Sequence, residues 1–434
     1  MPVPRYWSTL SLKLLVRTFA LTCLLVSPVA YAQTYTVLHN FTGGADGGNP
    51  YAGLTIDEAG NLYGTASSGG SNSNCINCGT VFKLVDHSGA WIFNTIYSFG
   101  GGLDGVAPYA RVVFGPEGIL YGTTVSGGRD EFGTVYKLQP PPNVCPSASC
   151  PWLESVLYSF GRYPDGQHPS RDDVVFDSAG NLYGATSSGG NNLTCDVNQP
   201  CGTVYELTHS AHGWNESVIY NFQGMNDGAF PNGVTFDSSG DLVGTNTFWQ
   251  GNFTGTVFSL IPNGQGGWSE RTLYDFSNGS NGEQPLAGVL SDGAGGFYGT
   301  TSYGGSGNGG TVWHLTSSSQ MNLISSFTYS QPLGYPLPGS AAVLTMDASG
   351  NLYGTTAVDG TYNQGSVFKL TPSDGGWTLT TLYSFTGGSD GGQPWGQVIL
   401  DSNGNIYGTA NLGGPTIGQC YGDLGCGVIF EIAP

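Results

Sequence analysis

A five-residue pattern, Asn-Leu-Tyr-Gly-Thr at residues 61–65, recurs whole or slightly altered six more times along the chain. Successive copies lie 54 to 62 residues apart, which is too long for a coiled-coil period and too short for separate domains. Repeats of this size made of strands and turns are typical of propeller blades. The aromatic position of the pattern falls at Tyr63, Tyr121, Tyr183, Val243, Tyr298, Tyr353 and Tyr407.

Each repeat unit contains four strand-like pieces separated by turn residues. In the third unit these are "DVVFD" (173–177), "NLYGATS" (181–187), "GTVYEL" (202–207) and "WNESVIYNF" (214–222). Alternating side chains in such pieces suit a pleated sheet. Gly184 interrupts the second piece, and we expect that a Cβ there would crowd a neighbouring backbone.

The two ends of the chain complete the count of strands. Residues 35–41, "YTVLHNF", match the fourth piece of a unit, whereas residues 427–432, "GVIFEI", match the third. Pairing these two segments gives seven complete units and leaves no exposed sheet edge. We therefore predict an all-β, seven-bladed propeller of four-stranded blades, formed as one domain by residues 33–434.

Aromatic residues recur at a fixed spacing within the fourth piece. A Trp precedes a Phe by eight residues at Trp91/Phe99, Trp152/Phe160, Trp214/Phe222, Trp268/Phe276 and Trp377/Phe385. Sheets covered on both faces by neighbouring blades bury both sides of their strands. These aromatics are therefore predicted to form the walls between blades.

The consensus unit reads "YSF-x-GG-x-x-DG-x-x-P", then "D-x-x-GNLYGTT", "GG" and "GTVFKL". This combination resembles the Gloeo/Verruco (GloVer) tandem repeat of secreted bacterial proteins, over essentially the whole chain after residue 32. The resemblance implies export and a surface or extracellular role, and it supplies no catalytic residues. Anchored members carry a C-terminal tail, whereas this sequence ends at Pro434 directly after its last strand, which favours free secretion or periplasmic residence.

The first 32 residues have the pattern of a secretory signal peptide. Arg5, Lys13 and Arg17 precede an apolar run that ends in Ala30-Tyr31-Ala32. The run is shorter than a membrane span and contains Pro28, so we expect cleavage before Gln33 and no membrane span afterwards. Removing three of the 11 Lys and Arg leaves eight against 30 Asp and Glu. This acidity disfavours nucleic acid as a partner.

Eight cysteines remain after the predicted leader, in four local pairs. In an exported chain such pairs are typical of disulfides. The alternative is a zinc site, since Cys75 and Cys78 have ligand spacing, but no second such pair lies nearby. The predicted disulfides join Cys75 to Cys78, Cys145 to Cys150, Cys195 to Cys201 and Cys420 to Cys426.

Two kinds of loop should emerge on one face of the propeller: the loop from the fourth strand into the next blade, and the loop from the second strand to the third. The first kind carries an Asp-Gly pair with a Pro shortly after it, which is a strong turn signal. A ring of carboxylates binding Ca²⁺ or hydroxyl-rich ligands is the functional alternative, although one Asp per loop is few for calcium. The residues are Asp46, Asp104, Asp165, Asp227 and Asp390, with Asn281 in the fifth position.

Residues that break the repeat are better candidates for a binding site, because folding alone does not explain them. Arg129, Arg162, His168 and Arg171 fall on or beside loops of that face, where they are either scattered surface charge or an anion pocket. Trp249 and Trp395 are the aromatic exceptions; they stack on sugar rings or a partner, or they plug loops together.

These features predict a secreted or periplasmic binding or surface-interaction module for carbohydrate or an extracellular protein. We expect a monomer that needs no cofactor or metal. One alternative is a glycan-active enzyme, such as an acidic-polysaccharide lyase in which Arg162 or Arg171 neutralises a carboxylate and His168 or a nearby Tyr removes a proton. Another is a purely structural component of the envelope or matrix.

Overall fold

The structure is a computed structural model. It describes residues 33–141, 152–169, 171, 173–191, 201–224, 227–248, 254–264, 266–276, 279–328, 342–415, 420 and 424–434. The predicted signal peptide, residues 1–32, lies outside the described residues.

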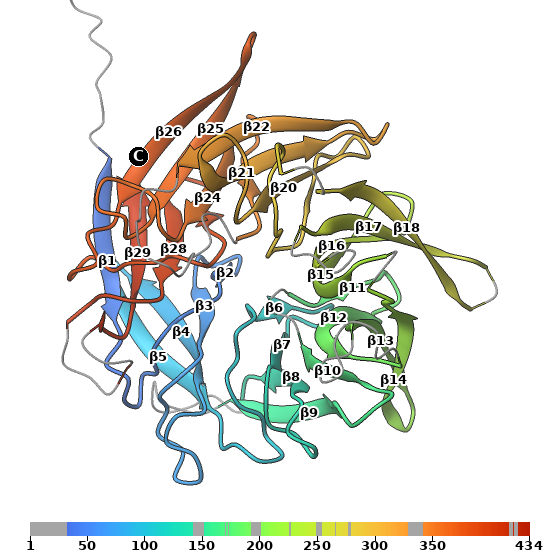
Figure 1. Cartoon of the computed structure of the whole chain (residues 1–434). Helices are drawn as coiled ribbons and strands as arrows, with labels where there is room; N and C mark the ends of the chain where they lie inside the picture. Colours follow the sequence, from blue (N-terminus) through green and yellow to red (C-terminus); the bar gives the residue numbers. More distant parts are fainter. Residues whose placement is uncertain are drawn as a thin grey trace, which may run out of the picture.

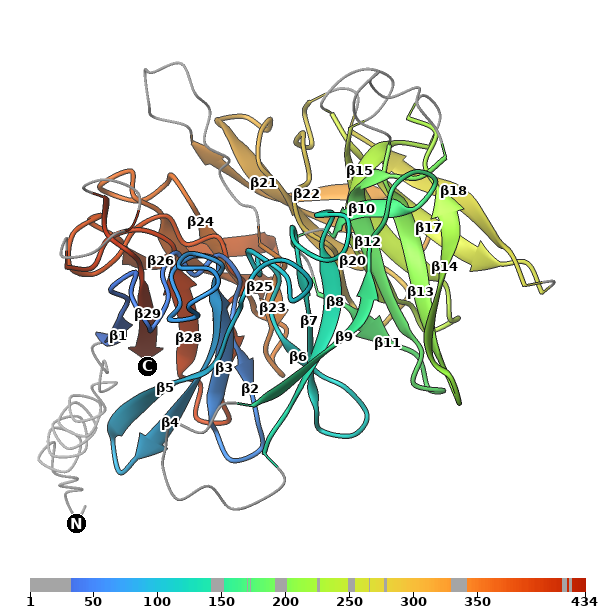
Figure 2. The same ribbon diagram turned by 90° about the horizontal axis from the view of Figure 1, so that it is seen from below.

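Seven antiparallel sheets surround a common axis, as Figure 1 shows along the axis and Figure 2 from the side. The chain is a seven-bladed β-propeller, as the repeat predicted. Blade 1 contains the strands β2 (Thr55–Ile56), β3 (Leu62–Ala66), β4 (Thr80–His87) and β5 (Ala90–Ser98). Blade 2 contains β6 (Val113–Phe114), β7 (Leu120–Thr124), β8 (Thr134–Gln139) and β9 (Leu153–Ser159). Blade 3 contains β10 (Gly166–Pro169), β11 (Val175–Phe176), β12 (Leu182–Gly189), β13 (Thr203–Ser210) and β14 (Gly213–Asn221).

The next three blades follow the same order from the axis outward. Blade 4 contains β15 (Ala229–Phe236), β16 (Leu242–Phe248), β17 (Thr256–Pro262) and β18 (Trp268–Asp275). Blade 5 contains β19 (Leu290–Ser291), β20 (Phe297–Thr301), β21 (Asn308–Leu315) and β22 (Met321–Thr328). Blade 6 contains β23 (Thr345–Met346), β24 (Leu352–Thr356), β25 (Ser366–Ser373) and β26 (Gly376–Ser384).

Blade 7 combines the two ends of the chain. It contains β27 (Ile399–Leu400), β28 (Ile406–Ala410), β29 (Val428–Ala433) and, as its outer strand, β1 (Thr34–Asn40). β1 runs antiparallel to β29, with Thr34 opposite Ala433 and Asn40 opposite Val428. The predicted closure is therefore confirmed, each strand lying within one residue of its expected bounds.

The inner strand of blade 3 differs from the expected single strand. It is split into β10 and β11, which both pair with β12. In four other blades the corresponding segment makes a single bridge, such as Gly48 with Ser68. The residues that follow the Asp-Gly pair thus extend the inner edge of the sheet. Turn composition alone did not predict this extra pairing.

The glycine of the pentapeptide makes room for an aromatic ring on the adjacent strand. Gly184 lies directly opposite Tyr205, and a Cβ on Gly184 would lie 2.4 Å from the Tyr205 hydroxyl. The expectation that a neighbouring backbone causes the crowding is therefore wrong for this residue. In blade 5 the same position, Gly299, faces the fully buried Trp313.

The repeated Trp, Phe and Tyr residues do form the walls between blades. All five Phe residues of the eight-residue spacing have no exposed surface. Each Trp packs edge-on against the pentapeptide Tyr of the preceding blade, as Trp152 does against Tyr63 at 6.0 Å between ring centroids. The other pairs are Trp91–Tyr407, Trp214–Tyr121, Trp268–Tyr183 and Trp377–Tyr298.

The threonine that ends the pentapeptide ties neighbouring blades together near the axis. Thr65 donates to the carbonyl of Ala110 in the next blade at 3.0 Å, and Thr409 closes the ring by donating to Ala52 at 2.7 Å. Since these threonines are buried, each hydrogen bond also satisfies a carbonyl that water does not reach. The same contact is made by Thr245, Thr300 and Thr355.

Candidate functional site

The loops with the Asp-Gly pair are closed by their own carboxylates. Asp165 accepts hydrogen bonds from the Tyr158 hydroxyl at 2.8 Å and from the Gly161 N–H at 2.6 Å. In the six described loops of this kind the partner on the outer strand lies seven residues earlier. The equivalent side-chain contacts are His39–Asp46, Tyr97–Asp104, Tyr220–Asp227, Tyr274–Asn281 and Tyr383–Asp390. These contacts account for the repeated Asp by loop structure, and its use in ligand binding stays a prediction.

His168 occupies a position at which the backbone φ is positive in every described Asp-Gly loop. It precedes Pro169 with a φ of 54°, in the left-handed region that few non-glycine residues adopt. Its backbone N–H donates to the Phe132 carbonyl at 2.9 Å, and its ring lies 2.9 Å from the Val125 carbonyl through Nδ1. The residue before the Pro has positive φ also at Asn49, Ala107, Phe230, Gln284 and Gln393. His168 therefore serves the attachment of this loop to the preceding blade.

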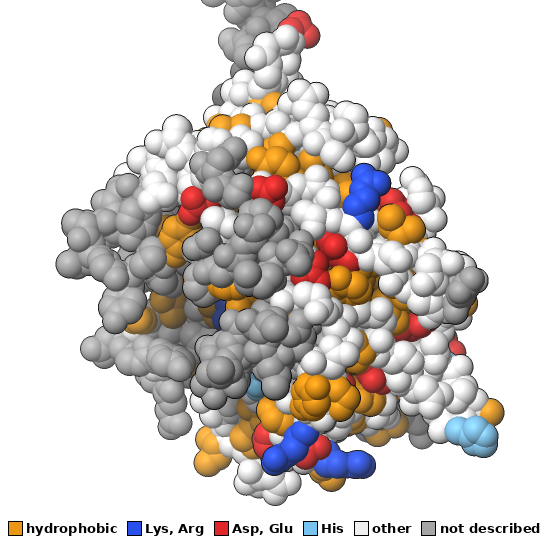
Figure 3. All heavy atoms as spheres, turned by 45° about the vertical axis from the view of Figure 1, so that its right-hand side comes forward, with side chains coloured by type: hydrophobic (Ala, Val, Ile, Leu, Met, Phe, Trp, Pro, Cys, Tyr) orange, Lys and Arg blue, Asp and Glu red, His pale blue; other side chains and the backbone are white. Residues whose placement is uncertain are grey.

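Arg129 and Arg162 lie on exposed loops. The Arg162 side chain is 82% exposed, and its Nε lies 3.8 Å from Asp130, the neighbour of Arg129. On the face drawn in Figure 3, Lys and Arg side chains are few; two of them lie side by side at the lower edge, next to acidic side chains. Arg129 and Arg162 are thus exposed charges on the protein surface.

Arg171 has different surroundings. Its guanidinium carbon lies 4.8 Å from the ring centroid of Tyr51 and 5.3 Å from that of Tyr109. Arg171 belongs to blade 3, Tyr109 to blade 2 and Tyr51 to blade 1. Blades 1 and 3 are not neighbours, so these contacts place the three residues next to the propeller axis.

Trp395 of blade 7 completes the same group. Its ring stacks on Tyr51 with centroids 5.4 Å apart and 26° between planes, while Tyr51 meets Tyr109 edge-on at 5.0 Å. The indole Nε1 is buried and has no hydrogen-bond partner among the described residues. We call Tyr51, Tyr109, Arg171 and Trp395 the axial cluster. It unites two residues predicted separately from the sequence.

Three members of the axial cluster occupy one position of the repeat. Tyr51, Tyr109 and Trp395 each follow the Pro of the Asp-Gly loop, at the start of the inner strand. The sequence signal for Tyr51 and Tyr109 was therefore an aligned aromatic column, which was missed because only Trp395 was recognised as an exception.

An ion pair joins the segments just before the inner strands β6 and β11. Arg111 contacts Asp173 of the next blade through Nε at 2.9 Å and also through Nη2, and its Nη1 donates to the Leu54 carbonyl at 3.3 Å. Blades 1, 2 and 3 are thereby linked through Arg111. This pair was not predicted, because the two residues are 62 positions apart in the sequence and come together only across two blades.

The charge and protonation of its side chains make the axial cluster a donor of hydrogen bonds to a ligand. Burial raises the pKa of Tyr51, and the nearby Arg171 charge offsets this only in part. Tyr51 is therefore a neutral phenol at neutral pH, and Arg171, which is exposed, keeps a permanent charge. With Tyr109 and Trp395, the axial cluster combines three partly exposed aromatic rings and one cation.

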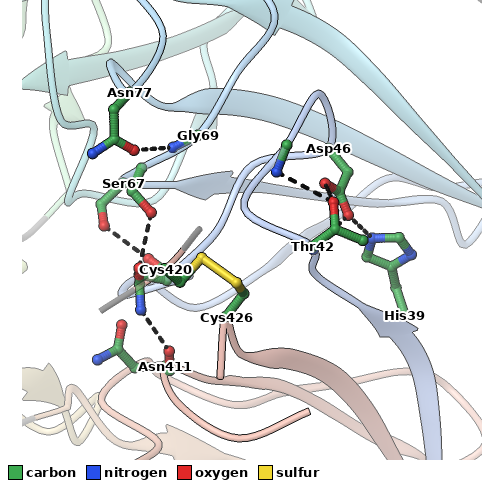
Figure 4. The surroundings of a disulfide bond; sticks show 12 residues. His39, Thr42, Asp46, Ser67, Gly69, Asn77, Asn411, Cys420 and Cys426 are labelled. Carbon is green, nitrogen blue, oxygen red and sulfur yellow. Dashed lines mark hydrogen bonds and ion pairs between the residues drawn. A yellow bond between two sulfur atoms is a disulfide. The ribbon is translucent and has the colours of Figure 1, made fainter. Parts of the chain in front are cut away.

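Two of the four predicted disulfides lie wholly among the described residues. Cys75 bonds to Cys78, and Cys420 bonds to Cys426, with Cα atoms 5.7 Å and 5.2 Å apart. Because Cys75 and Cys78 bond to each other, they are not thiolate ligands for zinc. Figure 4 shows the second bond near Asp46, which accepts from His39 and Thr42. Asn49 of the same loop donates to the Asn411 carbonyl at 3.1 Å.

The other two predicted disulfides are not confirmed in the same way. Cys145 and Cys150 both lie outside the described residues, so the bond between Cys145 and Cys150 stays a prediction. Cys201 is disulfide-bonded, but its predicted partner Cys195 also lies outside the described residues. The cysteine pairing of blades 2 and 3 therefore adds nothing to the candidate site.

The remaining predictions concern Trp249, metal ions and the membrane. Trp249 lies outside the described residues and cannot be placed in the site. Within the described ranges, no three His, Cys, Asp or Glu residues are grouped so as to hold a metal ion. The same ranges contain no helix long and apolar enough to cross a membrane.

Solved structures share the fold at low sequence identity. A fungal alcohol oxidase in complex with copper is 14% identical, with a TM-score of 0.53, covering 93% of this chain and 77% of its own. A puromycin hydrolase is 10% identical, with a TM-score of 0.54, covering 85% of this chain and 51% of its own. At these identities the likeness shows the fold alone.

The repeat itself matches a known family of sequences. No curated protein matches the chain significantly. The Gloeobacter/Verrucomicrobia repeat matches residues 26–148 and 146–344, which is well over half of the sequence. The chain, with its seven like blades, belongs to the Gloeobacter/Verrucomicrobia repeat family.

Proposed function

We propose that this protein is an exported binding module that takes an acidic carbohydrate at the axial cluster. The observation that carries the proposal is the position of Arg171 over Tyr51 and Tyr109, with Trp395 stacked on Tyr51. Aromatic faces stack on the apolar faces of sugar rings, and a guanidinium pairs bidentately with a carboxylate or sulfate. Export is supported by the leader pattern and by disulfides in a family of repeats.

The arrangement suits binding better than proton abstraction. A lyase of the kind considered above needs a base beside the group that neutralises the carboxylate. Of the two tyrosines beside Arg171, Tyr51 has a pKa that burial raises, which makes it a poorer base at neutral pH. His168, the other candidate base, donates through Nδ1 to the Val125 carbonyl as part of the loop attachment, and it is not among the side chains found in contact with Arg171 in the described residues.

Calorimetric titration with galacturonate oligomers, a sulfated galactan oligomer and a neutral glucan oligomer tests the proposal. We expect binding of an acidic oligomer by the natural protein and a loss of roughly 10- to 100-fold in Arg171→Gln, because a charged hydrogen bond contributes about 1.5–3 kcal/mol. Trp395→Leu should weaken binding as well. Arg129→Gln and Arg162→Gln remove the same charge from exposed loops and serve as matched controls.

Two results would contradict the proposal. Equal affinities of Arg171→Gln and the natural protein would remove the axial cluster from the site. A rise in ultraviolet absorbance from unsaturated sugar ends, during incubation with the uronate oligomers, would instead establish a lyase.

A further inference from the structure

One position of the repeat anchors the start of an inner strand to the preceding blade. The residue before the Gly that leads into the third strand accepts, through its backbone carbonyl, the N–H of the residue that precedes the Pro of the next Asp-Gly loop. Cys78 accepts from Ala107 at 2.9 Å. Cys426 accepts from Asn49 at 2.7 Å. The other described pairs are Phe132–His168, Cys201–Phe230, Thr254–Gln284 and Gln364–Gln393. We call the six accepting residues the anchor residues.

Two anchor residues hold the segments that lead into the axial cluster. Tyr109 lies two residues after Ala107, with a proline between them. Tyr51 follows Asn49 in the same way. Ala107 and Asn49 have φ of 57° and 54°, a left-handed conformation that persists in non-glycine residues only where the surroundings hold it. Because the proline fixes the next φ, the bond to the anchor carbonyl limits where each tyrosine can lie.

Disulfides hold these same two anchor residues. Cys78 is bonded to Cys75, and Cys426 is bonded to Cys420. The two anchor cysteines are each 1% exposed, whereas their partners are half-buried. Because the bonds join residues only three and six positions apart, the loops that present the anchor carbonyls have few conformations available.

The sulfur atoms also support the Asp-Gly loop that follows. A Cβ on Gly101 would lie 3.1 Å from the Cys78 sulfur. A Cβ on Gly43 would lie 2.5 Å from the Cys420 sulfur. Gly101 and Gly43 occupy one position of the repeat, two residues after the Phe that ends the outer strand. Each disulfide therefore contacts the next loop twice, through the anchor carbonyl and through a sulfur atom beneath a glycine.

Other blades show that folding alone does not require cysteine at the anchor position. Phe132, Thr254 and Gln364 accept the same backbone hydrogen bond. The side chain of Gln364 lies beneath Gly387, where an added Cβ would be 2.8 Å from its Cδ. A glutamine thus fills the space that a sulfur atom fills in the two loops above. The disulfides therefore add rigidity to an attachment that the backbone already makes.

We propose that Cys78 and Cys426 are positioning residues of the axial cluster, and that the acidic-carbohydrate site is complete only while both of their disulfides are formed. The ligand class rests on the proposed function. Reduction by a dithiol would break each S–S bond and leave two thiols on the protein, while the dithiol gives up two electrons and two protons and becomes a disulfide. The freed loops would hold their anchor carbonyls less firmly, so Tyr51 and Tyr109 would have to be ordered when the ligand binds. The site is therefore suited to an oxidising compartment.

Calorimetric titration of the full chain with the galacturonate and sulfated galactan oligomers tests this. Two double variants each remove one disulfide: Cys75→Ala with Cys78→Ala, and Cys420→Ala with Cys426→Ala. We expect each to bind the acidic oligomer about 2- to 10-fold more weakly than the natural protein, because ordering a side chain on binding lowers affinity by about this factor.

The third anchor cysteine provides a matched control. Cys201 accepts the same kind of hydrogen bond, but the strand that it anchors begins at Phe230 in blade 4, which contributes no residue to the axial cluster. The double variant Cys195→Ala, Cys201→Ala removes the predicted disulfide at this position. Its affinity for the acidic oligomer should equal that of the natural protein.

Fluorine NMR of the chain labelled with 5-fluorotryptophan measures the geometry without a ligand. The Trp395 resonance is the one that Trp395→Leu lacks. Because Trp395 stacks on Tyr51 at 5.4 Å, this resonance should shift or broaden when the Cys420–Cys426 bond is removed, and it should stay in place in the control. Dithiothreitol should cause the same change in the natural protein, and reoxidation should reverse it. This reduction keeps the sulfur atoms and covers the case in which a double variant does not fold.

The outcomes separate the two proposals. If the natural protein binds an acidic oligomer, unchanged affinity in both double variants or an unchanged Trp395 resonance would overturn the positioning role and leave the proposed function intact. An equal loss of affinity in the control would also overturn it, since the disulfides would then stabilise the whole ring. If the oxidised natural protein binds none of the oligomers, the proposed function fails, and the Trp395 resonance alone decides whether the disulfides position the axial cluster.

Discussion

At the scale of single residues, the repeat is explained by side chains that need space or a partner. The pentapeptide glycine is required by the aromatic ring opposite it, which the sequence did not reveal because the ring lies on another strand, more than a dozen residues away. Arg171 and Trp395 were found because they break the repeat. Tyr51 and Tyr109 were not, since a tyrosine in a tyrosine-rich chain looks ordinary until four blades bring these side chains together.

Gly184→Ala tests the explanation for the glycine. The new Cβ would lie 2.4 Å from the Tyr205 hydroxyl in a fully buried wall, so we expect overpacking to destabilise the fold by about 1–3 kcal/mol. Gly375→Ala is the matched control, because its Cβ would meet nothing within 4 Å. Urea unfolding measures both, and equal midpoints for the two variants would contradict the explanation.

At the scale of strands, the sequence predicted the elements well and their mutual contacts poorly. The two closing strands agree with prediction within one residue. The split inner strand of blade 3 was not predicted, because β10 forms from residues that also make the turn.

The threonines of the pentapeptide provide a test of how blades are joined. Thr65→Val and Thr245→Val each remove a donor to a carbonyl of the next blade and keep the shape of the side chain, so we expect a loss of about 1–3 kcal/mol each. Thr123 is equally buried, but its hydroxyl has no hydrogen-bond partner within the described residues. Thr123→Val should therefore cost little. A similar loss for all three in urea unfolding would show that the cross-blade bonds do not matter.

At the scale of the whole molecule, closure turns seven marginal sheets into one ring. A blade cannot bury both faces alone, so each depends on its neighbours, and the last blade depends on a strand from the opposite end of the chain. β1 is held by more than its ladder with β29. Tyr35 stacks on Tyr383 of blade 6 at 3.8 Å, and His39 stacks on Phe93 of blade 1 at 3.8 Å. The closing strand thus contacts both flanking blades, and the axial cluster, which spans blades 7, 1, 2 and 3, depends on it.

A circular permutant separates the role of β1 as a strand from its role as a chain end. Thr34 lies opposite Ala433, so a linker of about four residues from Pro434 to Gln33 forms an ordinary hairpin. New ends between Gly375 and Gly376 fall in the exposed hairpin of β25 and β26. We expect this permutant to fold with a Tm close to that of the natural order and to keep the binding behaviour of the axial cluster. Deleting residues 33–41 instead exposes the edge of β29 and should cause aggregation, which size-exclusion chromatography detects. A soluble, monomeric deletion variant with an unchanged Tm would mean that closure by β1 does not stabilise the ring.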